Sequence, residues 1–122
     1  MQVFTSCFKF AKSLDESKYF VVSISRYSPR GFKGYKCKEF APPAYLLRWF
    51  KNGLSRYHYS VRYRHVVLES INVHKVFENL AVQAGGRDIV LCCFEPTYEF
   101  CHRRLLAQYV QEVWGYSIKE LC

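Results

Sequence analysis

Two segments of the chain are almost wholly apolar and rich in β-branched and aromatic residues. They are residues 19–25, YFVVSIS, and residues 88–94, DIVLCCF. Strands of this composition are typical of parallel sheets, because such a sheet is covered on both faces and neither side of the strand meets water. Residues 3–5 and 117–121 have the character of two shorter strands, the second at a sheet edge. The pattern therefore predicts a mostly parallel sheet.

Helical periodicity separates these strands. Its clearest instance is the stretch 73–84, where apolar residues recur at intervals of three and four. Asn72 precedes this stretch as a capping residue, and Gly85 follows it as a helix terminator. Similar patterns predict helices over residues 8–18, 44–50, 56–71 and 100–114. Strands that alternate with helices predict the α/β class, here a single three-layer, Rossmann-like domain over residues 1–122 with a mostly parallel sheet and helices on both faces.

Folds of this class bind ligands at the carboxyl ends of their strands, where loops lead into helix N-termini. The rule selects two loops, residues 26–36 and 95–103. The first loop offers Arg26, Tyr27 and Lys33 as ligand-binding residues, and its basic side chains suit phosphate. The sequence contains neither a P-loop nor a dinucleotide-binding glycine motif. The loop therefore predicts an anion site without identifying the anion.

The second loop carries four residues suited to catalysis or anion binding: Glu95, Cys101, His102 and Arg103. Arg103 lies in the first turn of an expected helix, where it can hold a phosphate and, with the helix dipole, lower the pKa of the Cys101 thiol. Glu95 is a candidate general base, with His102 assisting. Structural roles are the alternatives: Cys101 packed as a small apolar residue, His102 paired with Glu99, and Glu95 paired with Arg103.

Six cysteines stand at positions 7, 37, 92, 93, 101 and 122. Since no secretion signal is visible, we expect reduced thiols. Cys92 and Cys93 would point to opposite faces of their strand, and Cys93 is interpreted as a buried strand residue. The spacing of Cys93, Cys101 and His102 is not a recurrent zinc-binding one, so we expect no metal site, with a structural zinc as the minor alternative, and no cofactor is identified.

The charge of the chain is unevenly distributed. The net charge of +8 comes from 18 Lys and Arg against 10 Asp and Glu. Residues 1–65 hold 13 basic and 3 acidic residues, whereas residues 66–122 hold 5 and 7. Ten of the basic residues lie in 26–65, interleaved with ten aromatic residues. This mixture suits an anion that carries flat bases, and a solvated basic face over an aromatic core is the structural alternative.

Membrane association and secretion are not indicated. No apolar run approaches the roughly 20 residues that a membrane-spanning helix needs. The first residues, MQVFT, show no signal peptide. We therefore expect a cytoplasmic protein with no membrane partner.

Several short motifs resemble those of a known family. They are SISR at 23–26, GFKG at 31–34, GGRDIVL at 85–91, CFE at 93–95 and FCHR at 100–103. In these motifs the chain resembles domain-of-unknown-function family 488, a family of small prokaryotic and phage proteins, over nearly its whole length. Phe94 stands where family members usually carry Tyr or Ala. The resemblance implies a Rossmann-type three-layer α/β domain. It also implies a site at the matching motif residues, which are Arg26, Glu95, Cys101, His102 and Arg103.

The function expected from these residues is binding of a phosphorylated small molecule, a nucleotide or nucleotide derivative, with hydrolysis or transfer at its sugar as one form of activity. Arg26 and Arg103 would bind the anion, and Glu95 would act on the sugar or on water. Cys101 or His102 would assist. Whether the protein is an enzyme stays open. The alternatives are a basic nucleic-acid-binding module that uses residues 26–65, and a phage or host protein-interaction role such as an inhibitor.

Overall fold

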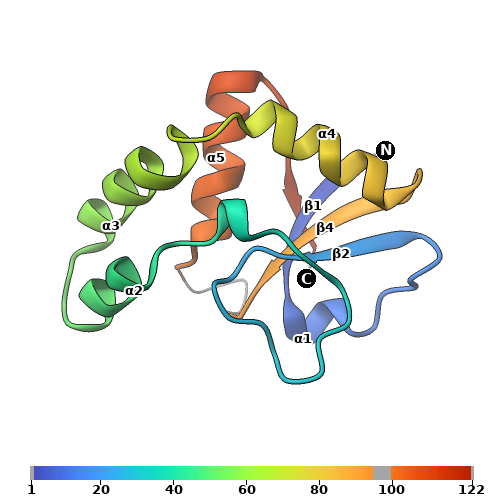
Figure 1. Cartoon of the computed structure of the whole chain (residues 1–122), viewed down its shortest axis with the longest axis horizontal. Coiled ribbons are helices and arrows are strands. Elements are labelled where there is room, and N and C mark those ends of the chain that lie inside the picture. Colours follow the sequence, from blue (N-terminus) through green and yellow to red (C-terminus); the bar gives the residue numbers. More distant parts are fainter. Residues whose placement is uncertain (1, 95–99, 122) are drawn as a thin grey trace.

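The computed structural model describes residues 2–94 and 100–121. Five strands form one sheet in the order β3-β2-β4-β1-β5, and every neighbouring pair is parallel (Figure 1). The strands are β1 (Val3–Cys7), β2 (Tyr19–Ser23), β3 (Tyr35–Lys36), β4 (Asp88–Cys93) and β5 (Lys119–Glu120). The prediction of an α/β fold with a parallel sheet is confirmed. Parallel pairing accounts for the apolar composition of β4, which lies at the centre of the sheet.

Except for α1, which is shorter than predicted, the helices begin and end close to the predicted positions. They are α1 (Phe8–Ala11), α2 (Ala44–Lys51), α3 (Arg56–Tyr63), α4 (Val73–Ala84) and α5 (His102–Trp114), with a 3-10 turn η1 (Lys38–Phe40) and a π-helical segment η2 (Arg64–Leu68) that continues α3. The Asn72 side chain accepts a hydrogen bond from the Lys75 N–H at 3.1 Å and so caps α4. Gly85, with φ +58°, ends α4 in the left-handed conformation that favours glycine.

The two faces of the sheet are covered unequally. Val22, Ile89 and Leu91 point into the main core, together with buried side chains of α2 to α5. Val90 and Cys92 point the other way, into a smaller cluster with Phe8 and Ala11 of α1. One sheet face is therefore covered by long helices and the other by a single helical turn and the loop that carries Phe32.

The helix predicted over residues 8–18 is wrong beyond its first turn. It ends at Ala11, and a turn follows in which the Asp15 carboxylate accepts hydrogen bonds from the backbone N–H and the hydroxyl of Ser17. The carbonyl of Asp15 accepts from the N–H groups of Lys18 and Tyr19. Aspartate and serine compete in this way with the helical hydrogen bonds of their own backbone, so the chain turns into β2 instead of continuing the helix.

Strands β2 and β4 bring the two predicted loops to one edge of the sheet. Their register pairs Val22 with Leu91 and Ser23 with Cys92, and the Ile24 N–H donates to the Cys92 carbonyl at 3.0 Å. The chain segments that follow Ser23 and Cys93 therefore leave the sheet side by side. Within residues 2–94 and 100–121, no helix is both long and apolar enough to cross a membrane.

Gly34 lies where the loop that follows β2 packs closely against this strand. A Cβ at this position would lie 2.6 Å from the Val21 carbonyl oxygen and 2.5 Å from a ring carbon of Phe32. We expect Gly34→Ala to lower the free energy of unfolding by about 1–3 kcal/mol, because backbone or ring must shift. Urea denaturation measures the loss. Lys33→Ala, at the exposed neighbouring position, should change it by less than about 0.5 kcal/mol; equal midpoints for both variants would contradict the prediction.

Candidate functional site

A cavity of about 120 Å³ lies at the carboxyl ends of β2 and β4. The loop after β2 contributes Ser25, Arg26 and Tyr27 to its wall. The end of β4 and the start of α5 contribute the second part, and the remaining wall comes from α2, α3 and the segment before α2. These other lining residues are Pro42, Leu47, Phe50, Tyr59, Phe94, Phe100, Cys101 and His102. The structure thus brings together four of the residues that the sequence singled out: Arg26, Tyr27, Cys101 and His102.

The walls of the cavity are largely aromatic. The Phe100 ring lies 5.4 Å from the Phe50 ring and 5.6 Å from the Tyr59 ring, between centroids. The Arg56 guanidinium lies over Phe100 at 5.5 Å, and that of Arg26 lies 5.9 Å from the ring of Tyr27. None of the described lining residues is acidic. The cavity therefore combines flat apolar walls with two arginines close by, a combination suited to a ring that carries a negative group.

Several of these wall residues were not predicted as site residues. Phe50 and Tyr59 have apolar spacing that fits the core, and sequence alone does not say that they line this cavity. The one available signal was their position in the basic and aromatic stretch 26–65.

His102 lies at the base of the cavity, in the first turn of α5, and is buried. Its Nε2 lies 2.7 Å from the carbonyl oxygen of Ile24. Because a carbonyl only accepts hydrogen bonds, Nε2 carries the proton. Burial lowers the pKa of His102 to about 4, the bond to Ile24 opposes this, and the charge of Arg103 adds to the lowering. At pH 7 the ring is neutral, with its lone pair on Nδ1.

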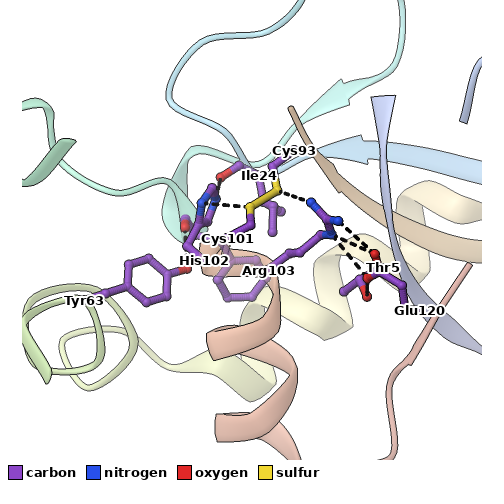
Figure 2. The surroundings of a disulfide bond; sticks show 9 residues. Thr5, Ile24, Tyr63, Cys93, Cys101, His102, Arg103 and Glu120 are labelled. Carbon is purple, nitrogen blue, oxygen red and sulfur yellow. Dashed lines mark hydrogen bonds and ion pairs between the residues drawn. A yellow bond between two sulfur atoms is a disulfide. The ribbon is translucent and has the colours of Figure 1, made fainter. Parts of the chain in front are cut away.

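Tyr63 holds the other side of this ring. The centroids of the two rings are 5.5 Å apart, and the Tyr63 hydroxyl donates to the Phe40 carbonyl at 2.7 Å. Figure 2 shows His102 between Tyr63 and Ile24, with Nδ1 directed toward the sulfur of Cys101 at 3.7 Å. The orientation of the imidazole is therefore determined by two chain segments that are distant from it in sequence, those of Ile24 and Tyr63.

Cys93 and Cys101 are joined by a disulfide bond (Figure 2). The expectation of reduced thiols is wrong for this pair, because α5 begins directly beside the end of β4 and brings Cys101 onto Cys93. Cys101 therefore has no thiol whose pKa could be lowered. Cys92 faces the opposite side of the sheet, as expected for the next residue of a strand, and burial raises the pKa of its thiol to about 12. Among the described cysteines, Cys7, Cys37 and Cys92 are free thiols.

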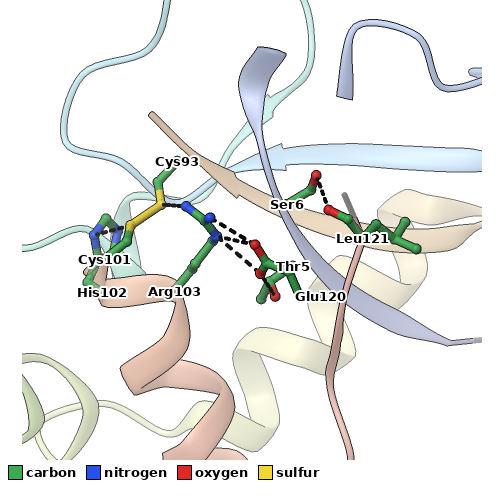
Figure 3. A network of polar contacts seen from close by, with 8 residues as sticks. All are labelled: Thr5, Ser6, Cys93, Cys101, His102, Arg103, Glu120 and Leu121. Atoms are coloured by element: carbon green, nitrogen blue, oxygen red, sulfur yellow. Dashed lines mark hydrogen bonds and ion pairs between the residues drawn. A yellow bond between two sulfur atoms is a disulfide. The ribbon is translucent and has the colours of Figure 1, made fainter. Parts of the chain in front are cut away.

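Arg103 does not line the cavity. Its side chain is 0% exposed, and Nε and Nη2 donate to the Glu120 carboxylate at distances of 2.8 to 3.2 Å. Nη1 donates to the Cys93 sulfur at 3.0 Å (Figure 3). The anion that Arg103 holds in this structure is thus a carboxylate of the chain itself, which differs from the predicted ligand-binding role. Arg103 cannot bind a ligand in the cavity because its side chain extends from α5 toward Glu120 on β5.

Glu120 is a residue that the sequence analysis missed. It lies on the two-residue strand β5, which pairs with β1, and it also accepts a hydrogen bond from the Thr5 hydroxyl at 2.6 Å. Burial raises the pKa of Glu120, but the hydrogen bonds from Arg103 and Thr5 outweigh it and hold this pKa below its usual value. No local motif marks Glu120, because its partners come from β1 and α5.

The remaining predicted site residues lie elsewhere. Lys33 borders a separate cavity of about 450 Å³ on the α1 face of the sheet, together with Arg30 and Arg87. Glu95, the candidate general base, lies outside the described residues, as does Glu99, so the pairs proposed for them are not described.

The N-terminus of α5 opens near the cavity. Cys101 is its N-cap residue, and the Cys101 side chain makes no capping hydrogen bond. The N–H groups at the start of a helix and the helix dipole together give such a terminus a partial positive charge that attracts anions. Cys101 and His102, which line the cavity, belong to this first turn.

The chain matches a family of known proteins. A family model described as the active DUF488-N3 subclade matches residues 7–113. The matched segment contains β2, β3 and β4 and only the last residue of β1, and it includes both cavity-forming loops. No curated protein and no solved structure matched the chain.

Proposed function

This chain belongs to the DUF488 family, and on that premise we propose that it binds a phosphorylated small molecule of nucleotide type in the cavity at the carboxyl ends of β2 and β4. The observation that carries the proposal is the composition of this cavity: aromatic walls, Arg26 at its border and the N-terminus of α5 beside it. These are the two kinds of group that a nucleotide requires, one for a flat base and one for a phosphate.

The size of the cavity supports a particular orientation of the ligand. A volume of about 120 Å³ corresponds to roughly four water molecules at about 30 Å³ each, which is room for a ring but not for a whole nucleotide. The base would enter between Phe50, Tyr59 and Phe100, while the phosphate would stay at the surface. Arg26 is exposed and Arg56 lies over Phe100, so both guanidinium groups can reach a phosphate there.

Binding is supported more directly than catalysis. In the disulfide-bonded state Cys101 offers no nucleophile. His102 presents Nδ1 as a proton acceptor, yet burial makes it a weak base. The matched subclade is described as active, and a reaction at the ligand's sugar is the form of activity that we propose.

A thermal-shift experiment tests the binding proposal. We expect the ribonucleoside monophosphates to raise the Tm in proportion to the logarithm of their concentration, and matched nucleosides or inorganic phosphate to act more weakly. Arg26→Ala should weaken nucleotide binding about 10- to 100-fold, since a charge-assisted hydrogen bond contributes about 1.5–3 kcal/mol. Arg48→Ala is the matched control, because Arg48 is an exposed arginine on α2 that does not line the cavity.

Two results would contradict the proposal: no shift in Tm with any nucleotide, or the same loss of this shift in both variants.

The second candidate function is nucleic-acid binding. It is favoured by exposed Trp49 and Tyr57, which lie on the two helices that carry Arg48, Lys51, Arg56 and Arg62. Binding of a single-stranded oligonucleotide that weakens steeply with salt, and that Arg48→Ala also weakens, would support this second function instead.

A further inference from the structure

Three side chains that commonly bind metal ions meet at the base of the cavity. Cys93 comes from the end of β4, and Cys101 and His102 come from the start of α5. Their ligand atoms all lie within 4.8 Å of one another, and all three residues are buried. We propose that, when the disulfide is reduced, the chain binds one zinc ion through the sulfurs of Cys93 and Cys101 and Nδ1 of His102. This proposal does not depend on the nucleotide ligand.

The imidazole of His102 is already oriented for such an ion. Its Nε2–H is held by the carbonyl of Ile24 at 2.7 Å, which leaves the lone pair of Nδ1 directed toward the Cys101 sulfur, 3.7 Å away. In a tetrahedral zinc site with Zn–S of about 2.3 Å and Zn–N of about 2.1 Å, the sulfur and nitrogen are about 3.6 Å apart. A backbone carbonyl on the second ring nitrogen is also the usual outer partner of a metal-binding histidine.

The two cysteines are spaced for an ion between them. Their Cα atoms are 7.6 Å apart, whereas disulfide-bonded cysteines usually have Cα atoms about 4.4–6.8 Å apart. Zinc-bound sulfurs are about 3.8 Å from each other, so the reduced side chains need more room than a disulfide does. We infer that they can separate around an ion while β4 and α5 stay in place.

Zinc binding requires two steps, reduction of the disulfide and then coordination of the ion. A dithiol reductant transfers two electrons and two protons to the disulfide, which becomes two thiols while the reductant is oxidised to its own disulfide. Zinc then displaces the two thiol protons and binds two thiolates, so two protons are released for each ion bound. Two thiolates and one neutral imidazole form a neutral complex with Zn²⁺, and this soft sulfur and nitrogen set favours zinc over magnesium or calcium.

The surroundings suit a thiolate at Cys93. Nη1 of Arg103 lies 3.0 Å from the Cys93 sulfur and donates a hydrogen bond to it, while the charge of Arg103 is balanced by Glu120. Cys101 and His102 also line the cavity. A fourth coordination position would therefore face the cavity, as in zinc sites with three protein ligands and one exchangeable position.

Cobalt titration of the metal-free protein tests this proposal, because Co²⁺ replaces Zn²⁺ and absorbs visible light when it is tetrahedral. In the reduced protein we expect one Co²⁺ per chain, with visible bands of a tetrahedral site and ultraviolet thiolate-to-cobalt absorption, both removed by one equivalent of Zn²⁺. Cys101→Ser and His102→Gln should each weaken binding at least about 100-fold. Cys92→Ala should leave it unchanged, since Cys92 faces the other side of the sheet.

The oxidised wild-type protein provides a comparison that needs no variant. With the disulfide intact, its two sulfurs are not available as thiolates, and we expect no tetrahedral cobalt spectrum. The proposal is overturned if the reduced wild-type protein gives no such spectrum, if the oxidised protein gives the same one, or if Cys92→Ala abolishes it while Cys101→Ser does not. Circular dichroism of each variant confirms that it is folded before titration.

Discussion

Glu120→Gln is expected to lower the free energy of unfolding by about 3–5 kcal/mol, the usual cost of removing one partner from a buried ion pair. The Arg103 side chain is 0% exposed and that of Glu120 is 20% exposed. Without the carboxylate, the Arg103 guanidinium stays buried and loses the ion pair with Glu120. Urea denaturation at neutral pH measures the loss.

An exposed ion pair of the same chemistry is the control. Arg64 and Glu112 lie 3.2 Å apart, but both side chains are about half exposed. Glu112→Gln should therefore cost less than about 1 kcal/mol. A double variant, Arg103→Met with Glu120→Leu, should recover much of the stability that Glu120→Gln loses, because no charge is then left buried. Equal losses for Glu120→Gln and Glu112→Gln would show that the buried pair does not stabilise the fold as described.

The same pair makes stability depend on pH in acid. The pKa of Glu120 in the folded protein lies below its ordinary value of 4.5. Its contribution is therefore fully present above about pH 4.5 and is lost as the pH falls through the lowered, folded-state pKa. Glu120→Gln should remove this part of the acid sensitivity and leave the part that belongs to His102.

His102 is expected to make the oxidised, metal-free protein less stable by about 3 kcal/mol as the pH falls from above 6.5 to below 4. Burial lowers the pKa of His102 from 6.5 to about 4, because the imidazolium would lose its hydration against Tyr63 and the sheet edge. Between these values the unfolded chain binds a proton that the folded chain does not, so acid favours unfolding. Denaturation at a series of pH values measures this slope, and NMR titration of the ring measures the pKa.

His102→Gln should flatten the stability curve in this pH range, since glutamine has no titrating group but can still donate a hydrogen bond to the Ile24 carbonyl. His65→Gln is the matched control, because the His65 side chain is 75% exposed. An unchanged slope in His102→Gln would mean that another group is responsible for the loss of stability in this range.

Local patterns were sufficient for most of the secondary structure. The cap at Asn72, the apolar spacing of 73–84 and the left-handed turn at Gly85 all act within one helix, so the sequence alone predicted α4 correctly. The apolar composition of 88–94 likewise predicted a strand covered on both faces, which is β4. The carboxyl-edge rule then placed Arg26, Tyr27, Cys101 and His102 in one region, because the ends of neighbouring parallel strands meet.

The sequence did not predict where short elements end. The helix expected over 8–18 is shorter in the structure, because the chain turns at Asp15. The strand expected over 117–121 contains only two residues, Lys119 and Glu120. In such short segments a few side-chain hydrogen bonds or one edge pairing decide the outcome, and propensity is too weak to compete with them.

By itself, the sequence determined the α/β class, the order of most elements and the edge of the sheet where the candidate site lies, because each of these follows from periodicity and local capping. Only the tertiary structure decided the partners of the reactive side chains. Arg103 binds Glu120, Cys93 is joined to Cys101, and His102 is held by Ile24. These contacts depend on how α5 and β5 return to the sheet and on the direction in which each side chain leaves its backbone. Such long-range geometry is set by the packing of the whole core and leaves no pattern in the neighbouring residues.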